Sequence, residues 1–93
     1  KQMKIVIYSK KNCQFCGKAK DLVKKLGLEY TEKNLEKDFE SNPIKLIEDI
    51  GKKVMSMPQV KIDGELVGGY NQMVEYFVEK GMINFQGEVI DNG

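Results

Sequence analysis

The stretch Cys13-Gln14-Phe15-Cys16 stands between two segments that predict a buried strand and an amphipathic helix. Before it, Ile5-Val6-Ile7-Tyr8 is a continuous β-prone run, as expected of a strand buried on both faces, and the polar residues 9–12 predict a loop. After it, apolar residues recur with the spacing of one helix face, at Phe15, Ala19, Leu22, Val23 and Leu26, and Gly27 predicts the helix end. The two cysteines therefore lie at a strand-to-helix junction, with Cys13 in the first turn of the helix.

The next segments extend this junction into a larger α/β pattern. Residues 28–35 include Tyr30 and Thr31 and predict a second strand, which makes a right-handed βαβ unit with the first strand and helix. Asn42-Pro43 predicts a helix start, with the Asn as N-cap and the Pro in the first helical position. The apolar stripe of this helix is formed by Ile44, Ile47 and Ile50, and Gly51 predicts its end.

A hairpin and a last helix complete the predicted fold. Residues 59–62 and 65–67 flank Asp63-Gly64, which is the strongest short-range hairpin signal. Asn71 is expected to cap a helix that Gly81 closes, and the tail from residue 82 to 93 either packs on the domain or frays. We therefore predict a single α/β domain over residues 1–93, with a mixed four-stranded sheet, three helices on both its faces and the order β-α-β-α-β-β-α.

The composition excludes several kinds of chemistry. The chain has no His and no Arg, so it lacks Cys–His and Ser–His catalysis, His-bearing metal sites and guanidinium clamps. Its net charge of +1 gives no general reason to expect nucleic acid or a membrane as partner. Residues 1–25 nevertheless hold eight Lys and one acid, so the positive charge gathers around the cysteines. With two cysteines, no membrane-length apolar run and no signal-peptide core, we expect a soluble cytoplasmic monomer.

The spacing of the cysteine pair fits thiol–disulfide exchange. The attacking species is a thiolate, and a helix N-terminus with Lys10 and Lys11 nearby lowers the pKa of a thiol from its usual value of about 8.5. Cys13 lies nearer the solvent and is expected to attack, whereas Cys16, three residues on, lies deeper and resolves the mixed disulfide. The alternatives are half of a zinc site, which would need ligands that the chain does not offer, and two unrelated buried cysteines.

Several separated motifs resemble the glutaredoxin family. Lys4-Ile-Val-Ile-Tyr-Ser-Lys10 with Cys13-Gln-Phe-Cys16 is similar to the first strand, lysine and CPYC-type site of that family. Ser56-Met57-Pro58-Gln59-Val60 resembles its TVP segment, and Gly68-Gly69-Tyr70-Asn71 resembles its GG-x-D segment. The resemblance covers about residues 3–80, and the MPQV and GGYNQMVEYF stretches look most like dithiol glutaredoxins of tailed bacteriophages. A viral protein of this kind would be located in the host cytoplasm.

This resemblance implies a thioredoxin-like fold and a glutathione site. It implies a cis peptide bond before Pro58, whereas an ordinary strand-entry proline would be trans. It also implies that Met57 pairs with an extended thiol-bearing peptide and that Lys10 binds the glycine carboxylate of glutathione. Gly69 and its neighbours would hold the γ-glutamyl end, although Gly68-Gly69 could equally be a flexible turn. The glutathione-binding residues expected in this way are Lys10, Phe15, Met57, Pro58, Gly69, Tyr70 and Asn71.

Some of these assignments have alternatives, and the sequence departs from the family in three places. Phe15 matches an aromatic position beside the active site but could belong to the core, and Lys52-Lys53 either faces the ligand or lies in a solvated loop. Gln14-Phe15 replaces Pro-Tyr, and Asn71 replaces an Asp that would pair with the γ-glutamyl ammonium. Residues 51–57 also look longer than in the commonest cellular forms.

The function expected from these residues is a glutathione-dependent dithiol oxidoreductase. It would reduce protein disulfides and glutathione mixed disulfides, with glutathione as co-substrate, no bound metal and no permanent cofactor. By analogy with the family, ribonucleotide reductase is a candidate protein substrate. One alternative is the same chemistry driven by a thioredoxin-reductase-type donor. Another is an iron–sulfur cluster held between two chains by Cys13 and glutathione thiolates.

Overall fold

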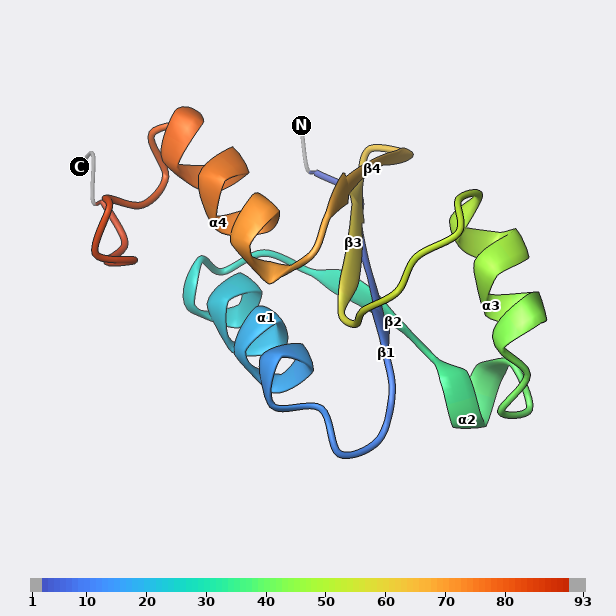
Figure 1. The fold of residues 1–93 in the computed structure, drawn as a ribbon. Helices are drawn as coiled ribbons and strands as arrows, with labels where there is room; N and C mark the ends of the chain where they lie inside the picture. The colour runs from blue at the N-terminus through green and yellow to red at the C-terminus, as the bar shows by residue number, and fades with distance from the viewer. Residues whose placement is uncertain (1–2, 91–93) are drawn as a thin grey trace.

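The structure is a computed structural model that describes residues 3–90. Four strands and four helices, one short helix more than predicted, follow along the chain in the order β-α-β-α-α-β-β-α (Figure 1). They are β1 (Ile5–Ser9), α1 (Gln14–Lys25), β2 (Tyr30–Asn34), α2 (Leu35–Asp38), α3 (Pro43–Ile50), β3 (Gln59–Ile62), β4 (Glu65–Gly68) and α4 (Tyr70–Glu79).

The strands form one mixed sheet in the order β2-β1-β3-β4. β1 pairs in parallel with β2, with Ile5 opposite Tyr30, because α1 provides the crossover between them. β3 runs antiparallel to both β1 and β4, and the β3–β4 turn is made by Asp63 and Gly64, both with positive φ. The predicted βαβ unit and hairpin are confirmed.

Helices cover both faces of the sheet, as predicted. Figure 1 shows α1 and α4 on one side and α3 on the other. The larger core lies between the sheet and α1 and α4, and its buried members are Ile5, Ile7, Ala19, Leu22, Val23, Val60, Ile62, Met73, Phe77 and Ile83. The smaller core packs Leu46 and Ile50 of α3 against Tyr8 of β1. Because Ile83 is 1% exposed, the start of the tail packs on the domain, and Ile83 forms a β-bridge with Val89.

Asp49, near the end of α3, ties this helix to the sheet through polar contacts. The Tyr8 hydroxyl donates to Asp49 Oδ2 at 2.6 Å, and Lys33 Nζ lies 2.9 Å from the same oxygen. These two contacts lower the pKa of Asp49, whereas burial and the neighbouring carboxylate raise the pKa of Tyr8 above its usual range. Lys61 also donates to the Asp49 carbonyl at 2.9 Å, so two lysines meet the negative end of α3.

Two local predictions are wrong. The segment expected to continue as a strand to Leu35 ends at Asn34, whose side chain accepts from the amides of Glu36 and Lys37 and thereby caps the short helix α2. The predicted N-cap Asn71 is already inside α4, and Gly69 occupies the cap position instead. By contrast, the Asn42 cap, the Pro at the first helical position and the left-handed Gly51 at the end of α3 are confirmed.

Candidate active site

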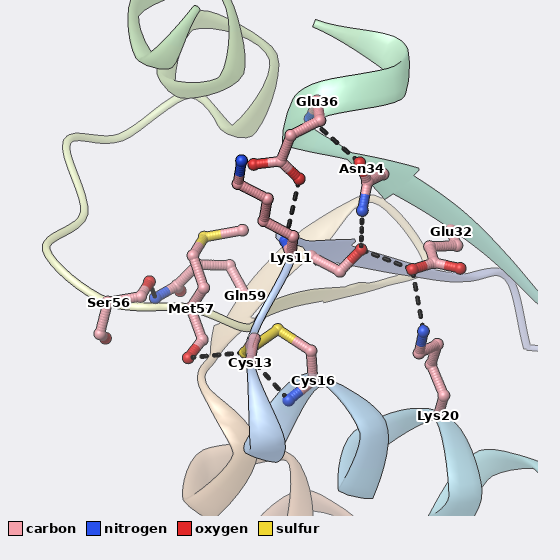
Figure 2. The surroundings of a disulfide bond; sticks show 11 residues. Lys11, Cys13, Cys16, Lys20, Glu32, Asn34, Glu36, Ser56, Met57 and Gln59 are labelled. Carbon is pink, nitrogen blue, oxygen red and sulfur yellow. Dashed lines mark hydrogen bonds and ion pairs between the residues drawn. A yellow bond between two sulfur atoms is a disulfide. The ribbon is translucent and has the colours of Figure 1, made fainter. Parts of the chain in front are cut away.

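The two cysteines form a disulfide at the N-terminus of α1 (Figure 2). Cys13 is the N-cap of the helix, one residue before the predicted first turn, and its side chain is partly exposed. Cys16 lies in the first turn and is only 2% exposed. The pair therefore has one accessible sulfur and one that is shielded from solvent.

Two backbone groups contact the accessible sulfur. The Cys16 amide donates to Cys13 Sγ at 3.2 Å, so one of the unpaired N–H groups of the helix N-terminus is directed at this sulfur. On the other side, the carbonyl oxygen of Met57 lies 3.7 Å from Cys13 Sγ (Figure 2). The helix N-terminus favours negative charge on Cys13, and the carbonyl can accept from its protonated form.

The segment that places Met57 is fixed by its neighbours. The Met57–Pro58 peptide bond is cis, as the resemblance implied, and Pro58 is buried at the entry to β3. Gln59 is 6% exposed, and its Nε2 donates to the Ser56 carbonyl at 2.9 Å, which closes the loop before the proline. Met57 is therefore presented beside the disulfide by a loop that is anchored at its end.

Phe15 belongs to the surface of the site and not to the core. It is 47% exposed, its ring lies 5.7 Å from that of Tyr70, and Lys18 Nζ lies 4.8 Å from its ring centroid. Since Tyr70 is the first residue of α4, the aromatic pair joins the N-termini of α1 and α4 beside the disulfide. The core alternative for Phe15 is wrong.

The glycine pair before α4 is required by the packing of the protein itself. Gln72 Oε1 accepts from the Gly69 amide at 2.9 Å. A Cβ on Gly68 would stand 3.0 Å from Gln72 Cβ, and Gly68 has a φ of +118°. A Cβ on Gly69 would stand 3.3 Å from Gln72 Oε1 and 3.4 Å from the Pro58 carbonyl oxygen. The small residues therefore accommodate Gln72 and the proline loop.

The remaining predicted site residues lie on the surface of the domain. Lys52 and Lys53 line a groove of about 330 Å³ together with Ser56, Gly68, Gly69 and Gln72. Lys10 and Asn71 are exposed, and within residues 3–90 neither side chain takes part in a hydrogen bond or ion pair. The structure thus brings together Cys13, Cys16 and Met57, as well as Phe15 with Tyr70, but does not itself join Lys10 or Asn71 to them.

A polar network behind the disulfide was missed at the sequence level. Ser9, expected in the loop, is the last residue of β1 and is 1% exposed. Its hydroxyl donates to Glu32 Oε2 at 2.5 Å and accepts from Asn34 Nδ2 at 3.2 Å. Lys20 Nζ lies 3.0 Å from the same Glu32 oxygen (Figure 2), and the Ser9 bond first, then Lys20, lowers the pKa of Glu32. The alternation Ile5, Ile7, Ser9 on one strand face was the signal that Ser9 points inward.

The described residues offer little for other kinds of site. Residues 3–90 contain no group of three or more Cys, Asp or Glu placed to hold a metal ion. Within the same range no helix is long and apolar enough to cross a membrane.

Comparisons with known proteins agree with this geometry. The sequence model of the family described as Glutaredoxin matches residues 5–67. The chain is 36% identical over 66 residues to a probable glutaredoxin of Synechocystis sp., an alignment that covers 71% of this chain and 73% of the relative. It is 31% identical over 81 residues to glutaredoxin 1 of Escherichia coli, covering 83% and 95% of the two chains.

A solved structure extends the likeness to three dimensions. The crystal structure of a buckwheat glutaredoxin–glutathione complex matches with a TM-score of 0.63 and 28% identity, over 83% of this chain and 69% of that one. A matching family model, similar relatives, the thioredoxin-like sheet order and a CxxC disulfide at a helix N-terminus thus coincide. The chain belongs to the glutaredoxin family and is a thiol–disulfide oxidoreductase.

Proposed function

We propose that this chain is a glutathione-dependent dithiol oxidoreductase in which Cys13 is the nucleophile and Cys16 the resolving thiol. The observation that carries the proposal is the asymmetry of the pair. Cys13 is accessible and receives the Cys16 amide at 3.2 Å, whereas Cys16 is 2% exposed. Thiol–disulfide exchange needs access and a stabilised thiolate on the attacking sulfur, and only Cys13 has both.

The proposed cycle balances in thiols and disulfides. The Cys13 thiolate attacks a substrate disulfide, forming a mixed disulfide and releasing one substrate thiolate. Cys16 then attacks Cys13 Sγ, releasing the second substrate thiol and leaving the Cys13–Cys16 disulfide seen in the structure. One glutathione thiolate attacks Cys13 Sγ and frees Cys16. A second glutathione attacks the glutathione sulfur of this mixed disulfide, which yields glutathione disulfide and the reduced enzyme.

The surroundings of Cys13 offer groups that complement glutathione, a peptide with two carboxylates. The Met57 backbone lies beside Cys13 Sγ, where an extended peptide can pair with it as an added strand, and Pro58 holds this segment in place. Lys10 and the lysines of the groove supply positive charge for the glycine carboxylate. Phe15 packs on Tyr70 and forms an apolar wall next to the sulfur.

The γ-glutamyl carboxylate is assigned to the N-terminus of α4. The amide of Gly69 is already bound to Gln72 Oε1, so the amides of Tyr70 and Asn71, which have no acceptor within the helix, are the ones to receive it. The buckwheat relative, which is 28% identical, was crystallised as a complex with glutathione.

The test is turnover of a small glutathione mixed disulfide with glutathione, glutathione reductase and NADPH. Wild type should turn over, Cys13→Ser should be inactive, and Cys16→Ser should keep part of the activity because glutathione can resolve the mixed disulfide in place of Cys16. Full activity in Cys13→Ser would overturn the proposal. Proteins carrying disulfides or glutathione adducts, in a reducing cytoplasm, are the proposed physiological substrates.

One feature favours a different electron donor. Asn71 carries no charge to pair with the γ-glutamyl ammonium, and its side chain is exposed. A thioredoxin-reductase-type flavoenzyme would reduce the same disulfide without that contact. If glutathione fails and such a reductase with NADPH sustains turnover through Cys13, this second candidate is the correct one.

A further inference from the structure

A continuous chain of hydrogen bonds runs behind the disulfide and connects the two segments that carry the cysteines. It begins on α1 at Lys20, one turn after Cys16, and crosses to β2 through the 3.0 Å contact with Glu32. Glu32 accepts from the buried Ser9 hydroxyl at the end of β1. Ser9 in turn accepts from Asn34 Nδ2 at 3.2 Å. These hydrogen bonds thus join α1 to the two parallel strands of the sheet.

The other half of this series of hydrogen bonds leads back to the loop before Cys13. Asn34 Oδ1 accepts from the Glu36 amide at 3.0 Å, which begins α2. Glu36 Oε1 then accepts from the Lys11 backbone amide at 2.9 Å (Figure 2). Lys11 is two residues before Cys13, and Asn12 between them has a φ of +55°, a left-handed conformation that Asn adopts more readily than most residues other than Gly.

Asn34 is the residue on which both halves depend. Its side-chain carbonyl caps α2, its side-chain amide holds Ser9, and its backbone amide donates to Asp38 Oδ2 at 2.7 Å. α2 has four residues and no fully buried side chain, and only Leu35 packs partly on the smaller core, so the cap is a main support of this short helix. Without the cap, Glu36 would lose the position from which it binds the loop.

We propose that Asn34 and Glu36 are positioning residues of the redox pair, which hold the Cys13 loop in register with the helix that carries Cys16. The consequence is a high effective concentration of one thiol at the other. That concentration sets how far the reaction of the reduced enzyme with glutathione disulfide proceeds. In this reaction the dithiol is oxidised to the Cys13–Cys16 disulfide, and one glutathione disulfide is reduced to two glutathione thiols.

The inference rests on thiol–disulfide exchange at Cys13, and glutathione serves in its test only as a redox buffer. The experiment measures the equilibrium constant of this reaction for the folded protein by acid quenching and separation of the oxidised and reduced forms. Glu36→Ala and Glu36→Gln both remove the charge, but Gln keeps a carbonyl oxygen that can accept from the Lys11 amide. The difference between them therefore reports the hydrogen bond and the packing of the side chain, without the effect of the charge.

Glu36→Ala and Asn34→Ala should lower the equilibrium constant about threefold to tenfold, the effect expected for loss of a hydrogen bond that acts in one redox state more than in the other. Glu36→Gln should stay within about twofold of wild type, as should the control Glu29→Gln, which changes an exposed carboxylate before β2. Resolution of a Cys13 mixed disulfide by Cys16 should slow in the two Ala variants by a similar factor.

Unfolding by urea, measured on the same variants, separates positioning from stability. If both Ala variants lose stability but keep the wild-type equilibrium constant and resolution rate, these hydrogen bonds only stabilise the fold and the proposal is wrong. An equal fall in Glu36→Gln and Glu36→Ala would also contradict it. Should Asn34→Ala fail to fold, the Glu36 pair decides alone. Failure of glutathione-driven turnover would leave this test intact, because the equilibrium requires only a reactive cysteine pair.

Discussion

Substituting Gly68 by Ala should destabilise the protein strongly, whereas the same change at Gly17 should stabilise it. At Gly68 a Cβ would stand 3.0 Å from both Cβ and Cγ of Gln72, and the residue has a φ of +118°. The unfavourable backbone conformation costs about 1–3 kcal/mol and the forced shift of Gln72 about 1–3 kcal/mol. We therefore expect the free energy of unfolding to fall by about 2–6 kcal/mol.

Gly17 provides the matched control. It lies inside α1 with nothing within 4 Å of the Cβ position, and its φ is not in the left-handed region. Ala is favoured over Gly in a helix by about 0.8–1 kcal/mol, so Gly17→Ala should gain roughly that amount. For a domain of this size, 1 kcal/mol corresponds to about 4–8 °C in the melting temperature.

Urea denaturation followed by circular dichroism measures both changes, and a double mutant divides the Gly68 effect. In a Gln72→Ala background the contacts with Cγ and Oε1 of Gln72 are removed, but the 3.0 Å contact with its Cβ remains. The cost of Gly68→Ala should therefore fall, yet stay above that of the backbone conformation alone. Equal costs of Gly68→Ala in the two backgrounds would refute the crowding by the outer part of the Gln72 side chain. A Gly68→Ala variant as stable as wild type would refute the whole argument that this glycine is required by its conformation and by Gln72.

Three further outcomes follow from the same contacts. Asn42→Ala removes the cap that accepts from the Ile44 amide at 3.0 Å and should lower the free energy of unfolding by about 1 kcal/mol in urea, whereas Asn42→Ser should restore most of it. The pKa of Glu32 is lower in the folded state, so its carboxylate stabilises the fold above the unfolded pKa, and this contribution is lost as the pH falls through the acidic range. Glu32→Gln should therefore weaken the decline of stability between about pH 5 and pH 3. Replacing Lys52 and Lys53 by Gln should raise the KM for glutathione a few-fold with little change in kcat, and added salt should reduce the difference in KM from wild type. As a control, the same change at Lys24 and Lys25, which end α1, should leave the KM unchanged.

Patterns that act over a few residues made much of the fold predictable. Asn42, Pro43 and Gly51 specify both ends of α3, and Asp63-Gly64 specifies the hairpin, because each residue acts on the backbone of its own turn. The position of Cys13 just before an amphipathic helix predicted that the site lies at the helix N-terminus and that Cys16 is buried, because both depend on the local helix geometry.

Features that depend on distant partners escaped the local patterns. α2 forms because Asn34 can cap it while also holding Ser9, which lies 25 positions earlier in the chain. The start of α4 is fixed by Gln72 reaching back to Gly69, a capping-box spacing that the more familiar Asn71 cap concealed. Phe15 has the spacing of a core residue, but its ring is 47% exposed and packs on Tyr70, which lies 55 positions later in the chain.

The assignment of Cys13 as the sulfur that reacts with glutathione is tested most directly by trapping the mixed disulfide. Cys16→Ser and Cys13→Ser, each treated with glutathione disulfide at neutral pH, would be compared by intact mass spectrometry over time. We predict rapid addition of one glutathione to the Cys16→Ser variant through Cys13, and little or no addition to Cys13→Ser, whose remaining thiol is 2% exposed in the structure. Equal or faster addition to Cys13→Ser would contradict the account.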